Sequence, residues 1–213
     1  MYDFNYYRAT SLESAAEIYS QNEDPVYLAG GMTLIPTLKQ RLARPTDVID
    51  LGGVDGLSDV EQSAETLSIG SMTTHAAVAA NSAVSSVIPA LSALAGGIGD
   101  PHVRNKGTLG GSVANNDPAA DYPAALVGLD AIVVTTQREI PAEEFFVGMF
   151  ETSLFEGELI SHVRFSIPDK AAYMKFANPA SRYAIVGVMV AKFPGQIRVA
   201  VTGAGPAVFR SAE

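Results

Sequence analysis

The chain has 213 residues, of which 47% are hydrophobic and 17% charged, a composition typical of a globular protein and not of a disordered one. Its formal net charge of −9 argues against a general surface for nucleic acid or anionic membrane. Because the sequence contains no cysteine, it excludes disulfides, a cysteine nucleophile, thiolate zinc sites and any iron–sulfur cluster carried by this chain.

The start of the chain and the lengths of its apolar segments indicate the subcellular localisation. Residues 1–6 lack the basic and apolar regions of a signal peptide. No apolar stretch reaches the ~20 residues that a transmembrane helix needs. We therefore expect a cytoplasmic protein without a membrane span.

The first 53 residues predict a small α/β unit in which strands and helices alternate, beginning and ending with a strand. Thr10 and Glu13 have the spacing of a capping box, which makes Thr10 the expected N-cap of the first helix. Thr33 is the candidate cap of the second helix. The elements are a helix ending near residue 20, a strand at 25–29, a helix at 34–42 and a strand at 48–51.

Residues 54–168 are expected to form a second unit, and residues 169–213 a third. The last third of the chain has the apolar runs and turn residues of a mainly antiparallel sheet. The Gly/Asn/Asp-rich segment 99–121 is interpreted as a long ordered loop with a function. No helix follows that would cover the last sheet, so we expect a truncated sequence. Strands are predicted at 66–70, 131–135, 159–167, 173–176, 185–191 and 197–201, and helices ending at 80, 96 and 129.

Two loops combine adjacent glycines with a small hydroxyl residue, at 29–33 (Ala-Gly-Gly-Met-Thr) and at 108–112 (Thr-Leu-Gly-Gly-Ser). Glycine lets the backbone adopt φ > 0 and lets a ligand approach the amides without meeting a Cβ. Successive exposed N–H groups form a nest that suits phosphate. Two such loops indicate a diphosphate held from two sides, as in a dinucleotide cofactor.

The two loops and their surroundings resemble the FAD-binding medium subunit of molybdenum hydroxylases, of the carbon monoxide dehydrogenase medium-chain type, with a related domain in xanthine dehydrogenase. The resemblance implies an α+β (α/β) fold of the vanillyl-alcohol-oxidase, PCMH-type FAD-binding kind, with two small α/β subdomains and a partial, mainly antiparallel C-terminal sheet unit. No segment matches the Rossmann fingerprint or the Walker pattern. The matching segments follow one order along the chain, at 29–33, 100–105, 108–112, 117–121, 157–160 and 175–183.

The cofactor that the resemblance implies is FAD. The first loop would donate backbone N–H groups to the pyrophosphate, with an added hydroxyl from Thr33, and the second loop would do the same from the other side. Met32 departs from the His, Gln or Gly that the family often has, at a position that mainly offers an amide. The implied cofactor-binding residues are Ala29, Gly30, Gly31, Met32, Thr33, Thr108, Gly110, Gly111, Ser112, Asn115, Asp121, Ile160, Lys175 and Tyr183.

Several of these residues have an ordinary structural alternative. Asp121 matches an aspartate that approaches the ribose or adenine end of FAD, but it could instead cap the helix that follows. Ile160 and Lys175 match positions at the flavin half, although Ile160 would be core by default and Lys175 needs a partner for its charge. Tyr183 matches an aromatic that shields one face of the isoalloxazine, or it packs on the sheet. Asn115 could take either role.

We expect no metal site and no catalytic side chain. The three histidines lie on different predicted elements without metal-ligand spacing, and no serine nucleophile elbow is present. Asp117 is expected to form a turn. Arg104 and Lys106 are either surface charges or cofactor contacts.

The resemblance also implies partners. A molybdopterin-containing large subunit would oxidise the substrate, and a small subunit with two [2Fe–2S] clusters would carry electrons to this chain's FAD, which passes them to an external acceptor. The absence of cysteine agrees with that division. Two alternatives stay open. One is a self-sufficient flavin oxidoreductase of the same fold, which would need an acid or base over the flavin. The other is a non-catalytic assembly subunit.

Overall fold

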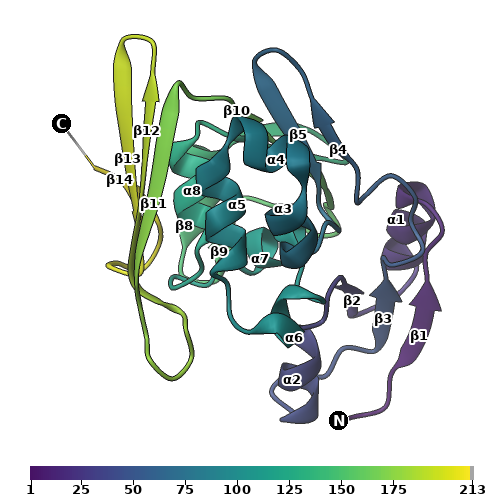
Figure 1. Ribbon diagram of the computed structural model, residues 1–213. Helices are drawn as coiled ribbons and strands as arrows, with labels where there is room; N and C mark the ends of the chain where they lie inside the picture. Colours follow the sequence, from purple (N-terminus) through teal and green to yellow (C-terminus); the bar gives the residue numbers. More distant parts are fainter. Residues whose placement is uncertain (212–213) are drawn as a thin grey trace.

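The computed structural model describes residues 1–211, and its N-terminal unit is built on a three-stranded parallel sheet in the order β1-β3-β2 (Figure 1). Parallel neighbours need crossover connections, and the two helices of this unit supply them. The predicted alternation of strands and helices is thus confirmed. The elements are β1 (Asn5–Arg8), α1 (Leu12–Ser20), β2 (Pro25–Leu28), α2 (Leu34–Lys39) and β3 (Asp47–Asp50).

The capping box of α1 lies one residue further along the chain than predicted. Its N-cap is Ser11, and the predicted cap at Thr10 is wrong. The Ser11 hydroxyl accepts from the Ser14 amide at 3.1 Å, and the Ser14 hydroxyl accepts from the Ser11 amide at 3.0 Å. This reciprocal pair satisfies two N–H groups at the helix start. Glu13 lies in the first turn, where its charge faces the positive end of the helix dipole.

The middle unit contains a five-stranded antiparallel sheet in the order β4-β5-β10-β6-β7. Its central strand, β10, pairs with β5 on one side and β6 on the other, so a late segment of the chain lies between two earlier ones. The predicted strands at 66–70, 131–135 and 159–167 are confirmed. The strands are β4 (Val60–Gln62), β5 (Thr66–Gly70), β6 (Ile132–Thr135), β7 (Glu139–Pro141) and β10 (Ile160–Ser166).

A layer of helices packs between the middle sheet and the C-terminal sheet (Figure 1). The segment 99–121 is not the long loop that its composition predicts, because it contains α6 and α7. Asp100 accepts from the Val103 amide at 3.0 Å and starts α6, while Thr108 accepts from the Gly111 amide at 3.1 Å and starts α7. The helices are α3 (His75–Ala80), α4 (Ser82–Val87), α5 (Pro89–Gly96), α6 (Pro101–Arg104), α7 (Leu109–Asn115), α8 (Tyr122–Gly128) and α9 (Ala142–Phe145). A two-stranded ribbon follows, formed by β8 (Phe146–Gly148) and β9 (Glu151–Thr152).

The C-terminal sheet is antiparallel in the order β11-β12-β13-β14, as predicted for this part of the chain. Its inner face packs on α5 and α8, with Met189 and Ala200 fully buried there. On its outer face Met174 and Ile197 are exposed. The strands are β11 (Lys170–Ala177), β12 (Ala184–Phe193), β13 (Gln196–Thr202) and β14 (Phe209–Arg210).

Two apolar cores hold the described residues together. One lies in the N-terminal unit around Ile49, and the other is shared by the middle sheet, the helices and the C-terminal sheet, so that Phe165 and Met189 belong to one cluster. The division at residues 53/54 and 168/169 stays a prediction. Among residues 1–211, no helix is long and apolar enough to cross a membrane.

Candidate functional site

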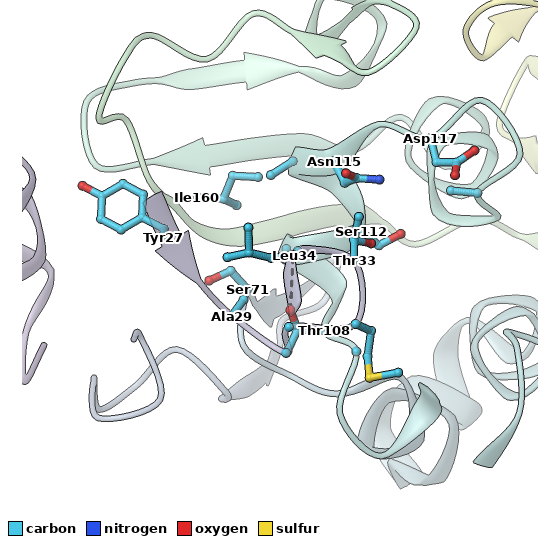
Figure 2. Close-up of a pocket in the computed structure, with 18 of the residues that line it drawn as sticks. Tyr27, Ala29, Thr33, Leu34, Ser71, Thr108, Ser112, Asn115, Asp117 and Ile160 are labelled. Carbon is cyan, nitrogen blue, oxygen red and sulfur yellow. Dashed lines mark hydrogen bonds between the residues drawn. The ribbon is translucent and has the colours of Figure 1, made fainter. Parts of the chain in front are cut away.

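A cavity of about 730 Å³ lies between the N-terminal and middle units (Figure 2). Residues 180–183, in the loop between β11 and β12, also line it. Its size is typical of sites for small molecules and cofactors, which run from about 300 to 1,000 Å³. All of the cofactor-binding residues named from the sequence line it, with the exception of Lys175. The two glycine loops, far apart in sequence, therefore face one space.

The first loop, residues 29–33, leaves β2 and offers open donors. Within residues 1–211, none of the amides of Gly30, Gly31, Met32 and Thr33 donates a hydrogen bond to the protein. Gly31 has φ +71°, a conformation that favours glycine. Thr33 occupies the N-cap position of α2, as predicted, but its hydroxyl makes no cap bond and therefore stays available.

The helix after this loop is shorter than predicted. α2 ends at Lys39 instead of residue 42. Arg41 then adopts φ 60°, a left-handed conformation that cannot continue the helix.

In the second loop, residues 108–112, the amides of residues 109–112 are already satisfied. The Leu109 amide donates to Thr73 O at 3.0 Å and the Gly110 amide to Ser71 O at 2.8 Å. The Gly111 amide donates to the Thr108 hydroxyl, and the Ser112 amide to Thr108 O at 3.0 Å. A nest of open amides is therefore present in the first loop and absent from the second. What the second loop offers is the Ser112 hydroxyl, which has no hydrogen-bond partner within the described residues.

Close packing explains why the two loops need glycines. A Cβ on Gly30 would lie 1.9 Å from Lys106 O, so the first loop touches the backbone just before the second. A Cβ on Gly110 would lie 2.5 Å from the Ser71 Cβ. A Cβ on Gly107 would lie 2.6 Å from His75 Nε2. These glycines bring protein segments together, whereas the sequence argument gave the glycines of the two loops a role in turning the backbone and in ligand approach, and gave Gly107 no role.

Sequence reasoning did not include His75 among the site residues, although it lines the cavity. It is 4% exposed, and its Nδ1 has no hydrogen-bond partner within the described residues. Burial lowers the pKa of His75 to about 4, and the charge of Arg104 acts in the same direction. The imidazole is therefore neutral at pH 7. No group of three or more His, Cys, Asp or Glu residues able to hold a metal is found among residues 1–211.

Asp121 lines the cavity, and two side chains of β11 donate hydrogen bonds to its carboxylate. It accepts from the Tyr173 hydroxyl at 2.5 Å and from Lys175 Nζ at 2.9 Å. Burial raises the pKa of Asp121, and the bonds from Tyr173 and Lys175 oppose that rise. Asp121 occupies the N-cap position of α8, but its carboxylate makes no cap bond to the helix, so capping does not account for this side chain. The partner that the Lys175 charge needs is Asp121, with Gly97 O as a further acceptor at 3.3 Å.

The remaining predicted residues lie around the same space. Ile160 is buried at the start of β10 and faces the cavity (Figure 2). Asn115 ends α7 with no side-chain hydrogen bond within the described residues. Tyr183 is 48% exposed. Its pKa is raised, mainly because the hydroxyl is partly buried and also because of the negative charges of Asp117 and Asp121.

Three flanking residues also have defined positions. Asp117 forms the expected turn by accepting from the Ala119 amide at 2.9 Å. Arg104 donates to Ile98 O and Gly99 O, both at 3.1 Å, which gives it a structural role. Lys106 is exposed, and it is its carbonyl that the first loop approaches.

A family model described as the FAD-binding domain in molybdopterin dehydrogenase matches residues 2–169. The chain belongs to this family. The chain is 37% identical to the nicotine 6-hydroxylase medium subunit of Paenarthrobacter nicotinovorans, in a match that covers 93% of this chain and 74% of the relative. It is 31% identical to the carbon monoxide dehydrogenase medium chain of Hydrogenophaga pseudoflava, covering 97% and 77%.

Solved structures agree with the family. The carbon monoxide dehydrogenase of Hydrogenophaga pseudoflava that lacks the Mo-pyranopterin moiety matches with a TM-score of 0.92 and 32% identity, over 98% of this chain and 77% of that chain. Quinoline 2-oxidoreductase from Pseudomonas putida 86 matches with a TM-score of 0.92 and 29% identity, over 98% and 77%. The predicted family, fold class and cofactor are confirmed: the chain is an FAD-binding subunit of molybdenum hydroxylase-type dehydrogenases.

The residues of the cavity fit FAD. Four successive open amides and the Thr33 hydroxyl in the first loop can donate to a pyrophosphate without a cation. The Ser112 hydroxyl can donate from the second loop. Tyr183 can offer an aromatic face to a planar ring.

Proposed function

We propose that this chain is the electron-transfer subunit of a three-part complex. Its FAD takes electrons from the [2Fe–2S] clusters of a small subunit and delivers them to an external acceptor, while a molybdopterin-containing large subunit oxidises the substrate. Bound FAD supplies the exchange between one-electron and two-electron reduction. The observation that carries the proposal is the cavity itself, which gathers the two glycine loops and the later segments of the chain around one space.

The contribution of the chain's own residues is to bind and orient. We propose that the first-loop amides and the hydroxyls of Thr33 and Ser112 hold the pyrophosphate. Asp121, fixed by Tyr173 and Lys175, would accept hydrogen bonds from the ribose or adenine end. Ile160 and Tyr183 would contact the flavin half. Lys175 would then act on FAD through Asp121.

The engaged state of Asp121 favours this role over a self-sufficient flavoenzyme. Its carboxylate is ion-paired to Lys175 and also accepts from the Tyr173 hydroxyl, so it is not free to act as a base. A chain that oxidised its own substrate would need an acid or base poised at the flavin. The lack of cysteine means that this chain supplies no thiolate ligand for a cluster, as expected if the clusters lie on a partner.

Reconstitution tests the proposal. The purified chain with FAD would be combined with separately purified large and small subunits, and substrate-dependent reduction of an artificial acceptor would be measured. We expect turnover by the complete complex and none when this chain or the small subunit is omitted. Turnover by the isolated chain would favour the self-sufficient alternative. Assembly with both partners in a folded chain that binds no FAD would favour the assembly subunit.

A further inference from the structure

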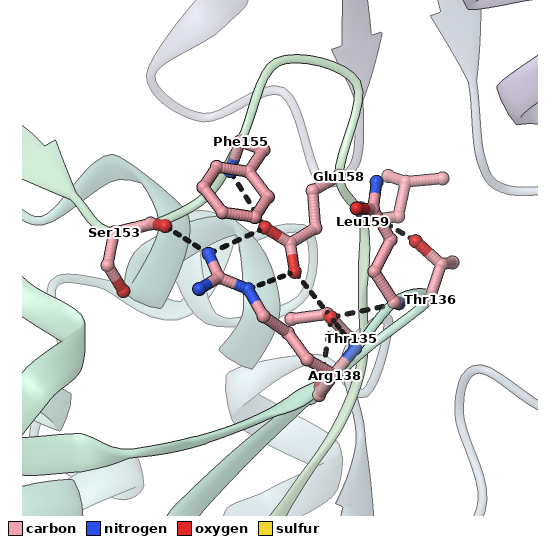
Figure 3. A network of polar contacts seen from close by, with 8 residues as sticks. Thr135, Thr136, Arg138, Ser153, Phe155, Glu158 and Leu159 are labelled. Atoms are coloured by element: carbon pink, nitrogen blue, oxygen red, sulfur yellow. Dashed lines mark hydrogen bonds and ion pairs between the residues drawn. The ribbon is translucent and has the colours of Figure 1, made fainter.

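A buried carboxylate, Glu158, lies in the cavity wall where the end of β6, the turn after it and the segment 153–158 meet (Figure 3). Its side chain has 0% exposure. A buried charge is costly unless it is both paired and hydrogen-bonded. The roles assigned above to the loops and to Asp121 do not account for it.

Four donors saturate this carboxylate. Oε1 accepts from Arg138 Nε at 3.0 Å and from the Thr135 hydroxyl at 2.6 Å. Oε2 accepts from Arg138 Nη2 at 3.1 Å and from the Phe155 amide at 2.7 Å. Because each oxygen already accepts two bonds, Glu158 is not placed to take a proton from a substrate. Its chemistry is that of a fixed acceptor joining segments 20 residues apart in the chain.

Arg138 extends the network to the edge of the cavity. Its Nη2 also donates to Ser153 O at 2.5 Å, and its guanidinium carbon lies 3.8 Å from the centroid of the Phe155 ring. Phe155 lines the cavity and is 59% exposed. One Arg–Glu pair therefore fixes both ends of the segment 153–158 and covers one side of an exposed aromatic ring.

The same segment contacts the N-terminal unit on its other side. The Tyr27 hydroxyl donates to Gly157 O at 3.2 Å. Gly157 has φ +74°, and a Cβ there would approach the Tyr19 ring to 3.0 Å. The rings of Tyr19 and Tyr27 stack with centroids 4.8 Å apart. The middle unit thus holds, through Glu158, a stretch of wall that rests on the unit carrying the first loop.

We propose that Glu158 and Arg138 are positioning residues for FAD. They hold the wall segment 154–160, all of which lines the cavity, against both units, and so keep the distance between the first loop and the rest of the site. Their effect on the cofactor passes through this segment. The inference rests on FAD binding in this cavity, which the unmodified chain tests by itself.

Two substitutions separate this role from simple stability. Glu158→Gln keeps the shape but replaces one acceptor oxygen by an NH2 group, so at least one of the four donors loses its acceptor. Arg138→Lys keeps the charge but cannot bind both carboxylate oxygens and Ser153 O in the same planar geometry. The control is Glu139→Gln, which breaks another Arg–Glu pair of the middle sheet, joined at 2.5 Å to Arg164 and outside the cavity lining.

The experiment measures FAD affinity by fluorescence titration, the visible circular dichroism of bound flavin and the melting temperature of the FAD-free protein. We expect both variants to bind FAD at least about tenfold more weakly with altered visible dichroism, and the control to stay within about twofold of wild type. If E158Q does not fold, R138K decides by the same criterion, since that side chain is 34% exposed.

Three results would overturn the inference. The first is a folded R138K or E158Q with wild-type affinity and dichroism, even if it melts lower. The second is an equal loss of affinity in the control, which would indicate general destabilisation. The third is a wild-type chain that binds no FAD, and this would overturn the site as a whole.

Discussion

Replacing Gly30 by alanine tests whether the two loops must touch for the FAD site to form. The new Cβ would lie 1.9 Å from Lys106 O and 2.7 Å from the carbonyl carbon, and both are backbone atoms that cannot rotate away. Real Cβ contacts essentially never fall below 3.0 Å, so the loops must move apart. Overpacking of this kind costs about 1–3 kcal/mol. Because the open amides lie on the displaced loop, we expect FAD affinity to fall by about tenfold or more, since 1.4 kcal/mol corresponds to a factor of ten.

The assay combines FAD fluorescence titration with urea unfolding of the FAD-free protein. Gly96→Ala serves as the control, because a Cβ there meets only the Ala79 Cβ, at an ordinary 3.8 Å, and lies in α5. Alanine in a helix should leave FAD affinity unchanged and stability equal or higher. A Gly30→Ala protein with wild-type affinity and wild-type unfolding free energy would refute the contact between the loops as drawn.

Three further predictions concern His75, Lys175 and the N-cap of α1. His75 should make stability pH-dependent: its folded pKa of about 4 lies below the unfolded value, so stability falls as pH drops from about 6.5 to 4, by at most about 3 kcal/mol. Urea unfolding at several pH values should show a smaller slope in His75→Gln, and an unchanged slope would contradict the burial. Lys175→Gln leaves Asp121 buried without its cation, which raises the pKa of Asp121 in the folded state further above its unfolded value. This variant should therefore lose stability as the pH rises through the folded-state pKa of Asp121. A variant equally destabilised at pH 4 and pH 8 would argue against the pair. Ser11→Ala should cost about 1 kcal/mol while Thr10→Ala costs almost nothing, and the reverse order would contradict the observed cap.

The sequence predicted the first loop well because a strand running into adjacent glycines is a local pattern. The open amides of this loop depend on its own backbone and not on contacts with a distant segment. The second loop looked alike in sequence, but its Leu109 and Gly110 amides donate to carbonyls of a distant segment, residues 71–73. Its next two amides, at 111 and 112, donate to Thr108 of the same loop. Nothing in the local pattern distinguishes an open amide from one that tertiary contacts satisfy.

The sequence analysis misjudged one stretch and did not find one ion pair, for different reasons. In residues 99–121, Asp100 and Thr108 were usable cap signals three residues ahead of the amides they accept from, and the Gly/Asn composition outweighed them. The Glu158–Arg138 pair carried no such signal, because it depends on the position of the segment after β9 relative to the end of β6. Lys175 shows the intermediate case: the need for a partner was evident, and its identity as Asp121 required the fold.

The most direct measurement is the visible spectrum of the purified chain after incubation with FAD and gel filtration. The account predicts that flavin absorbance elutes with the protein, and that Gly30→Ala elutes with much less. A wild-type chain that is folded by circular dichroism and elutes colourless would contradict the assignment of this cavity to FAD.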